Sequence, residues 1–421
     1  MLLITKSSKY LLPFISVIFL SGEAVVNANN FEFDRPTLIS QDIKNSETVT
    51  FADPVLEQEI RRELDLSEDE PITRDRLSEI TFLSIFHGDL SRLDGIEYLT
   101  NLKKLWLSNN KITDLTPLAE LSNLEVLLLN DNQITDITPV AGLSNLKKLW
   151  MSNNKISDLT SLAGLSNLEV LLLTNNQIGD LTPLRQLRNL KGISMSNNQI
   201  KDLTPLARLS NLKSLSLWRN EINDLTPLAE LKSLKSLLLA YNEITDVKPL
   251  AGLNNIERLW LQNNEISDIT PLAELNNLGT LLLGYNQITE ITPLPELSNL
   301  TKLSLSNNQI SDFSLLAQLK NLKDLDLSNN QISNISFLAG LKNLKNLDLE
   351  NNQIRDITPI AQLNNLEDLW LSDNEIRNIA PISRLNNLSM LHLDGNSIIN
   401  FKPVRNLART CFGCEIKEQT F

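Results

Sequence analysis

The chain repeats itself at a step of 22 residues, and this step constrains its fold more than any other feature. From residue 102 to residue 407, seven columns are apolar in every copy, with no insertion or deletion. An eighth column is Asn in all fourteen copies, from Asn110 through Asn242 to Asn396. The apolar members of the first copy are Leu102, Leu105, Leu107, Ile112, Leu115, Leu118 and Leu121. Because one such unit cannot enclose a core, neighbouring units must stack.

Each copy predicts a short strand followed by a turn. Leu105 and Leu107 flank Trp106, which is the period-2 pattern of a strand with one buried face. The chain then turns over the core, where the amide of a buried Asn satisfies backbone groups that would each cost about 1–3 kcal/mol unpaired. We therefore expect the Asn column to form a ladder. Thr116 and Pro117 predict a short helical turn, in which Thr caps the turn and Pro occupies a position that needs no N–H.

The pattern L-x-x-L-x-L-x-x-N-x-I resembles the leucine-rich repeat from residue 102 to about residue 398. Its 22-residue form, written "NLKKLWLSNNKITDLTPLAEL" in the first copy, resembles the internalin-type repeats of bacterial surface and secreted proteins. This resemblance implies an α/β solenoid of the horseshoe kind. Its concave face would be a parallel β-sheet, its convex face would carry short 3₁₀ turns, and a helical cap would precede it. Domains of this family bind other proteins.

The ends of such an array expose its core and need caps. The stretch "DPVLEQEIRREL" predicts a helix that Asp53 caps and Pro54 begins, and residues 73–80 predict a second helix. We assign residues 53–80 to a helical N-terminal cap, 81–403 to the leucine-rich repeat domain and 404–421 to a C-terminal cap. The first unit, 81–101, is degenerate, since Gly88 replaces the ladder Asn. Residues 29–52 are polar without a period and predict a linker.

Residues 1–28 are typical of an export signal. Lys6 and Lys9 precede ten apolar residues, Leu11 to Leu20, and "VNA" supplies small residues for cleavage. Ten apolar residues are too few to span a bilayer, which needs roughly 20. The alternative is a disordered or weakly anchored N-terminus. We expect a secreted, periplasmic or envelope protein with no membrane span in the mature chain. The N-terminal end lacks the cysteine-framed cap common in animal extracellular repeat domains, which favours a bacterial source.

Composition and motifs argue against catalysis and against nucleic acid. The net charge of −13 opposes binding to phosphates, which need clustered Lys and Arg. The only histidines, His87 and His392, stand at opposite ends of the array. Neither a Ser-His-acid set nor a phosphate-binding loop is visible in the sequence. We therefore expect no enzyme, no cofactor and no metal centre.

Two further patterns have more than one interpretation. An acidic column precedes the turns, and it consists of Asp114, Asp136, Asp158, Asp180, Asp202, Asp224, Asp246, Asp268, Glu290, Asp312 and Asp356. Such a row of carboxylates suits Ca²⁺, but the favoured role is to accept the free N–H groups of each turn, because Asn334, Asn378 and Asn400 replace Asp there. The pair Cys411 and Cys414 predicts a local disulfide that closes the far cap. Two free thiols, or a bond to a partner, are the alternatives.

The variable residues of each strand are expected on the concave surface, because they alternate with buried Leu. Their central column reads Trp106, Leu128, Trp150, Leu172, Ser194, Ser216, Leu238, Trp260, Leu282, Ser304, Asp326, Asp348, Trp370 and His392. Contiguous apolar patches mark interaction sites, and Trp and Tyr are enriched among binding hot spots. The alternative is drift on a repeated template, since alternating Trp and Leu is also what duplicated pairs of repeats would leave.

We predict partner contacts at two patches and two further residues. The first patch combines Trp106, Leu128, Trp150 and Leu172 with Lys104 and Lys148 at its rim. The second patch contains Tyr241, Trp260, Leu282 and Tyr285, and Trp218 and Trp370 are further candidates. Later strands are acidic, so the face is basic at one end and acidic at the other. Such a gradient orients a partner more than it tightens binding.

These observations favour an exported, monomeric binding module whose partner is a protein. One alternative is a glycan-binding envelope protein, because Trp faces stack on sugar rings. Another is an intracellular regulatory scaffold similar to the leucine-rich repeat regulator of a protein phosphatase. Retention of residues 1–28 in the mature protein would favour the scaffold.

Overall fold

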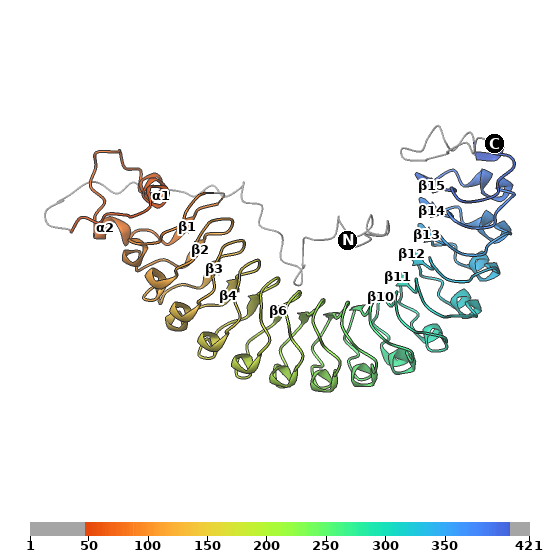
Figure 1. Ribbon diagram of the computed structural model, residues 1–421, viewed down its shortest axis with the longest axis horizontal. Helices are drawn as coiled ribbons and strands as arrows, with labels where there is room; N and C mark the ends of the chain where they lie inside the picture. Colours follow the sequence, from red (N-terminus) through yellow and green to blue (C-terminus); the bar gives the residue numbers. More distant parts are fainter. Residues whose placement is uncertain (1–46, 87, 405–421) are drawn as a thin grey trace, which may run out of the picture. The chain divides into compact units, whose positions relative to one another are not determined.

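The structure, a computed structural model, describes residues 47–86 and 88–404. Within this part of the chain fifteen strands form one parallel sheet in chain order (Figure 1). The strands are β1 Phe82–Ser84, β2 Lys104–Trp106, β3 Val126–Leu128, β4 Lys148–Trp150, β5 Val170–Leu172, β6 Gly192–Ser194, β7 Ser214–Ser216, β8 Ser236–Leu238, β9 Arg258–Trp260, β10 Thr280–Leu282, β11 Lys302–Ser304, β12 Asp324–Asp326, β13 Asn346–Asp348, β14 Asp368–Trp370 and β15 Met390–His392. The repeat domain is therefore the solenoid that the sequence predicts.

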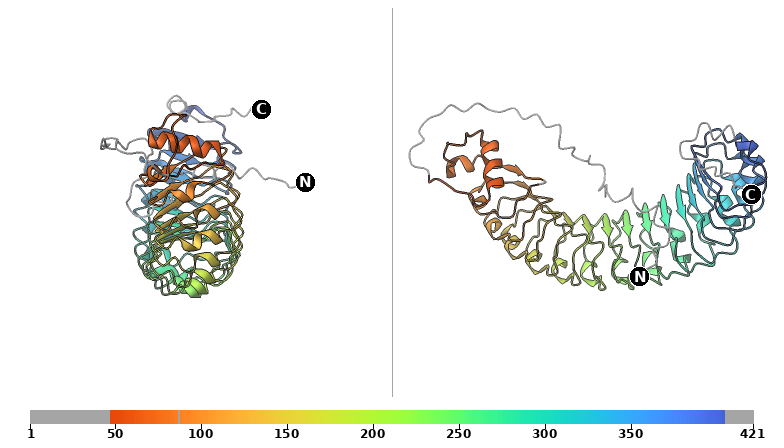
Figure 2. Two further views of the ribbon diagram at one scale, coloured as in Figure 1. Left: turned by 90° about the vertical axis from the view of Figure 1, so that its left-hand side faces the viewer. Right: turned by 45° about the horizontal axis from the view of Figure 1, so that its top comes forward.

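Each 22-residue unit makes one coil, which is named here by its strand. The register advances by the repeat step, so that Leu105 pairs with Leu127 and Trp106 with Leu128. The middle residue of every strand is buried, as Leu105 is, and the core runs continuously from the cap to Val404. Strands line the inner side of the arc of coils, and short 3₁₀ turns line its outer side (Figures 1 and 2).

The 3₁₀ turns follow the acidic column. They are η2 Ile96–Tyr98, η3 Thr116–Leu118, η4 Thr138–Gly142, η5 Thr160–Leu162, η6 Thr182–Leu184, η7 Thr204–Leu206, η8 Thr226–Leu228, η9 Lys248–Leu250, η10 Thr270–Glu274, η11 Leu294–Glu296, η12 Ser314–Gln318, η13 Ser336–Gly340, η14 Thr358–Gln362, η15 Ala380–Arg384 and η16 Lys402–Val404. The expectation that Thr116 caps its turn is wrong, because its side chain makes no capping bond. Asp114 does so instead, since its Oδ1 accepts from the Thr116 N–H at 2.8 Å.

The acidic column is thus a row of turn caps. Asp or Asn accepts the corresponding N–H in thirteen coils, and Asn334 does so from Ser336 at 2.9 Å. The exception is Glu290, whose side chain is one methylene longer. There the turn, η11, begins four residues after the carboxylate rather than two. The side-chain and backbone bonds from Thr226 also lower the pKa of Asp224 below its ordinary value.

The Asn column forms the predicted ladder. Asn242 Nδ2 donates to the carbonyls of Leu217 and Leu239 at 3.1 and 3.0 Å, and its Oδ1 accepts from the Ile222 N–H at 3.1 Å. Asn396 repeats this arrangement at the far end. At the near end the Oδ1 of Asn110 is buried without a partner in the described chain. The degenerate first coil therefore lacks the backbone N–H bond that the Asn Oδ1 accepts in later coils.

The N-terminal cap is built as its sequence predicts, with two differences. Helix α1 spans Pro54–Leu64, and the Asp53 side chain accepts from the Val55 N–H at 3.0 Å. Helix α2 is only Arg74–Leu77, shorter than the predicted 73–80. The expected linker also ends earlier than residue 52, since Val49 and Phe51 are buried in the core. Thr48 forms an antiparallel bridge with Thr73, so the packed cap begins near residue 47.

Candidate functional site

The strand register brings the predicted first patch together. Trp106, Leu128, Trp150 and Leu172 occupy successive rungs of β2 to β5. All four side chains are half-buried, whereas the residues just before and after each of them in the chain are buried in the core. They therefore lie on the concave face, side by side at the strand spacing of about 4.8 Å.

Two residues that the sequence analysis missed extend this patch. Phe82 on β1 meets the ring of Trp106 edge-on, with centroids 4.9 Å apart. Phe86 lies 6.0 Å from the same ring and is 39% exposed. The signal for Phe82 was its place one step of 22 before Lys104, in the degenerate first unit of the repeat domain. We call Phe82, Phe86, Trp106, Leu128, Trp150 and Leu172 the first aromatic patch.

The first aromatic patch has a basic rim and two buried N–H donors that lack a hydrogen-bond partner among the described residues. Lys104 is exposed and Lys148 half-buried, on the rungs beside Trp106 and Trp150. The indole N–H groups of these two Trp side chains are buried and have no partner within the described chain. An unpaired buried donor costs about 1–3 kcal/mol. Packing in the array alone does not account for Trp at these positions.

The middle of the concave face carries small, polar side chains that are almost fully buried. Ser194 and Ser216, on β6 and β7, are 3% and 1% exposed. Their hydroxyls are occupied within the protein, since Ser194 bonds Thr174 at 2.9 Å and Ser216 bonds Ser196 at 2.8 Å. This stretch separates the first aromatic patch from the second.

The second patch is not a strand surface throughout. Trp260 lies on β9, but Tyr241 and Tyr285 lie in the turns after β8 and β10, with φ of 56° and 57°. Asn or Asp holds this left-handed position in most coils, and bulky residues adopt it only at a cost. The third exception is Arg219, whose guanidinium lies 5.2 Å from the Trp218 ring and 5.1 Å from the Tyr241 ring. The sequence analysis missed Arg219.

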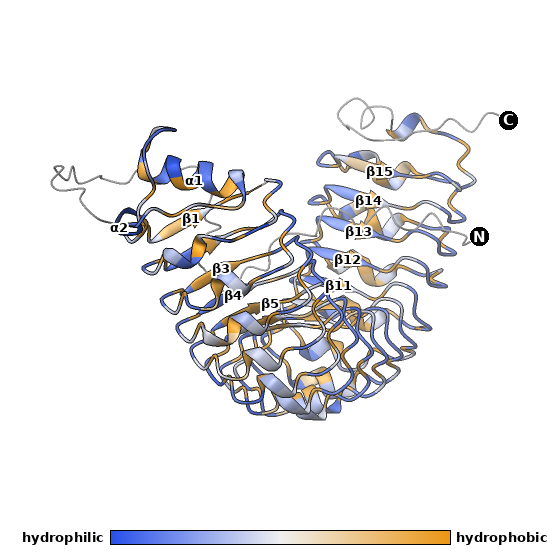
Figure 3. Cartoon of the chain, turned by 60° about the vertical axis from the view of Figure 1, so that its left-hand side comes forward, coloured by the Kyte–Doolittle hydropathy of each residue, from blue (hydrophilic) through white to orange (hydrophobic). Residues whose placement is uncertain are grey.

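The later strands form an acidic end of the face (Figure 3), where hydrophilic residues recur from β12 to β14. Asp326 accepts from Ser304 Oγ at 2.8 Å and from the Ser328 N–H at 3.0 Å. Asp348 accepts from the Glu350 N–H at 2.9 Å. Burial, and then the negative charge of Asp326, raise the pKa of Asp348 to about 8.

Trp370 belongs to this acidic end. Its ring stacks on His392 with centroids 6.2 Å apart and an angle of 14° between the planes. Burial also raises the pKa of Glu350, which His392 partly offsets. Trp370 is therefore part of a separate surface from Trp106 and Trp150.

The remaining candidates fall into two groups. Cys411 and Cys414 lie outside the described residues, and so does His87. Among residues 47–86 and 88–404, no three His, Cys, Asp or Glu side chains are grouped so as to hold a metal ion. In the same part of the chain no helix has the length and apolarity to cross a membrane.

The chain matches the family described as "Leucine Rich repeats (2 copies)". The matches cover residues 78–120, 122–164, 166–208, 188–230, 210–252, 232–274, 276–318 and 320–362. Its repeats therefore match that family over more than half of the chain.

Solved structures extend the similarity. An internalin, InlF of Listeria monocytogenes, is 34% identical with a TM-score of 0.65, over 88% of this chain and 96% of that one. A leucine-rich repeat protein of Leptospira interrogans is 30% identical with a TM-score of 0.69, over 80% of this chain and 96% of that one. The plant peptide hormone receptor RGFR1, in complex with RGF2, is 21% identical with a TM-score of 0.57, over 77% of this chain and 64% of that one, and shares the fold alone.

Proposed function

Because this chain belongs to the internalin-like family of leucine-rich repeat proteins, we propose that it is an exported protein that binds another protein on its concave face. The first aromatic patch is the main contact surface. The protein acts as a monomer and has no catalytic activity. The leader at residues 1–28 carries it out of the cytoplasm, as the sequence predicts.

The observation that carries this proposal is the makeup of the first aromatic patch. Phe86 is 39% exposed, the Trp and Leu side chains are half-buried, and lysines border them. An apolar centre with a charged rim is the anatomy of a protein interface. Phe, Trp and Leu next to one another also exceed what single exposed apolar residues would explain.

A protein partner is favoured over a glycan. Sugar rings stack on Trp but also need hydrogen-bonding side chains around them. The strand between Trp106 and Trp150 instead presents two apolar residues: Leu128, which lies between the two Trp residues, and Val126, which lies between Lys104 and Lys148. The RGFR1 structure, in complex with RGF2, gives one example of this fold with a bound partner.

The test is recovery of a partner from envelope extract of the native host by the full repeat domain. We expect one protein to be retained by the native chain and lost from the double variant Trp106→Ser, Trp150→Ser. A partner retained by the double variant would move the site, first to the second patch. Recovery of a polysaccharide in place of a protein would support the glycan alternative, and a mature chain that keeps residues 1–28 would support the intracellular scaffold.

A further inference from the structure

The flank of the solenoid is interrupted between the coils of β11 and β12. Elsewhere among the described coils, the N–H of the Ile column donates to the Asn Oδ1 of the next coil, as Ile288 does to Asn308 at 3.0 Å. Ile310 makes no such bond, and Asn330 Oδ1 instead receives a long bond from Asn308 N at 3.4 Å. The N–H that should return to the Ile310 carbonyl, that of Gln331, is also unpaired, although Gln309 and Gln353 make this bond at 2.9 Å.

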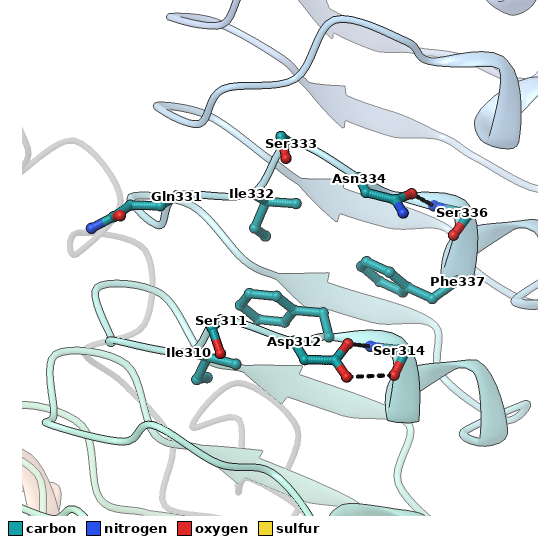
Figure 4. Close-up of a pocket in the computed structure, with 11 residues that line it drawn as sticks. Ile310, Ser311, Asp312, Ser314, Gln331, Ile332, Ser333, Asn334, Ser336 and Phe337 are labelled. Carbon is teal, nitrogen blue, oxygen red and sulfur yellow. Dashed lines mark hydrogen bonds between the residues drawn. The ribbon is translucent and has the colours of Figure 1, made fainter.

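The strand side of this junction is intact. Ser304 pairs with Asp326 in the normal register, and Asn330 Nδ2 still donates to the carbonyls of Leu305 and Leu327 at 3.2 and 3.1 Å. The opening is therefore confined to the flank, between the Asn ladder and the 3₁₀ turns. It is a lateral cleft of about 200 Å³, and Figure 4 shows its lining residues on the two coils.

Departures from the repeat pattern coincide with the cleft, and two of them line it. Phe313 stands where most coils have Ile or Leu, and Phe337 stands where eleven coils have Pro. The two rings stack with centroids 6.2 Å apart and planes 22° apart, between η12 and η13.

The chemistry of the lateral cleft is apolar below and polar at the mouth. Its floor contains Ile310 and Ile332, each 4% exposed, together with Phe313 and Phe337 at 5% and 7%. The mouth offers the unpaired Ile310 and Gln331 N–H groups and the Ile310 carbonyl. The one carboxylate there, Asp312, is already engaged by the N–H and hydroxyl of Ser314 at 2.8 and 2.9 Å.

We propose that the lateral cleft is a second recognition site, on the flank rather than on the concave face, for one apolar side chain of a partner protein and its adjoining main-chain amide. An apolar cavity of about 150 Å³ takes benzene, so the cleft has room for one aromatic or branched side chain. The open N–H and C=O groups complement a peptide amide, which supplies one acceptor and one donor. Asp312 is the only ionisable side chain among the described residues of the lining, and its carboxylate disfavours an anionic occupant, which suits a neutral side chain.

The probe is N-acetyl-phenylalaninamide, which carries an aromatic ring between two amides. N-acetyl-alaninamide, which lacks the ring, and toluene, which lacks the amides, are the comparison probes. Binding to the full chain is measured by ligand-detected saturation transfer. The test variant, Phe313→Ile with Phe337→Pro, restores the residues that other coils have. Trp106→Ser with Trp150→Ser is the matched control on the concave face.

We expect the ring-containing amide to bind the native chain and the concave-face control equally. We expect it to bind the restored variant at least about tenfold more weakly, while the restored variant melts no lower than the native chain. Equal binding to the restored variant, or no binding to the native chain, would overturn the site. Toluene binding as tightly as the amide would overturn the main-chain part of the proposal. If the double variant does not fold, Phe313→Ile alone must weaken binding, and unchanged binding there overturns the site as well.

Discussion

Asp326 and Asp348 lie in register on neighbouring strands, two carboxyl groups on adjacent rungs of the acidic end. The pKa of Asp348 rises from the ordinary 3.8 to about 8 through burial and the charge of Asp326. Between those pH values the folded chain holds a proton that the unfolded chain releases. The free energy of unfolding therefore falls as pH rises from about 4 to about 8.

The first prediction concerns a substitution that removes this titratable group. Asp348→Asn keeps the shape of the side chain but cannot ionise, so the variant should be more stable than the native chain at pH 8 by at least about 1 kcal/mol, the value of one unit of pKa shift. At pH 5 the difference should be smaller, and it should vanish only as the pH approaches the ordinary value of 3.8. Denaturant unfolding at both pH values measures the difference. An equal fall in stability for both proteins would show that Asp348 is not the group responsible.

The second prediction concerns the Asn ladder. Asn242→Ala removes three bonds to carbonyls and leaves the Ile222 N–H unpaired, so it should destabilise by about 1–3 kcal/mol. Asn110→Ala should cost less, because the Oδ1 of Asn110 has no partner to lose. Thermal melting of both variants is the measurement. If Asn110→Ala costs as much as Asn242→Ala, the acceptor bond is not what the ladder contributes.

The third prediction concerns turn capping. Glu290→Asp should place a carboxylate at the distance that serves the other coils and stabilise the chain by roughly 0.5–1 kcal/mol. The reverse change, Asp224→Glu, should destabilise by a similar amount, since Asp224 Oδ1 accepts from the Thr226 N–H at 2.8 Å. The pair is compared by denaturant midpoint. A loss of stability in both would mean that η11 needs Glu290 for another reason.

The fourth prediction separates binding from stability at the first aromatic patch. Trp150→Ser should change stability by no more than about 0.5 kcal/mol, because Ser occupies this column at Ser194 and Ser216. Trp106→Ser should cost about 1 kcal/mol, since Trp106 also contacts the Phe82 ring. Each should weaken partner binding by about 2 kcal/mol in a titration. Trp260→Ser is the control, and an equal loss there would place the partner across both patches.

The fifth prediction concerns the basic rim. Lys104→Glu with Lys148→Glu should slow association with the partner more than it speeds dissociation, and high salt should reduce the effect. Lys232→Glu is the control, because Lys232 bonds the Ala229 carbonyl beside a turn of the outer side. Stopped-flow association at two ionic strengths measures this. A change confined to the dissociation rate would make the lysines direct contacts rather than steering charges.

Periodic features of the molecule were predictable from the sequence. Leu105 recurs every 22 residues, so its burial, the strand register and the rungs from Trp106 to Leu172 all followed from one observation. Helix α1 was predictable as well, because Asp53 and Pro54 mark its start locally. The partner, the leader and the state of Cys411 and Cys414 stay predictions.

Features that depend on one particular contact were not predictable. Phe51 belongs to a stretch without a period, yet its ring packs against Gly95, where an added Cβ would approach to 2.5 Å. The shifted pKa of Asp348 requires its burial, which the exposed side of an alternating strand does not suggest. Phe337 departs from the Pro column in the sequence, but its stacking on Phe313 in the adjacent coil is visible only in the structure.

The alternating rungs of the first aromatic patch lie in two similar 44-residue segments, 102–145 and 146–189, which differ at 12 positions. Lys104 and Trp106 therefore reappear as Lys148 and Trp150 two strands away, a displacement of about 10 Å. A partner displaced by that distance meets the same side chains again, so the central part of the surface offers two equivalent binding positions. Phe86 has no copy in the second segment, so it makes the two positions different. If a partner binds this patch, we therefore expect its register to be set at the cap end, by Phe86, which lies outside the two segments.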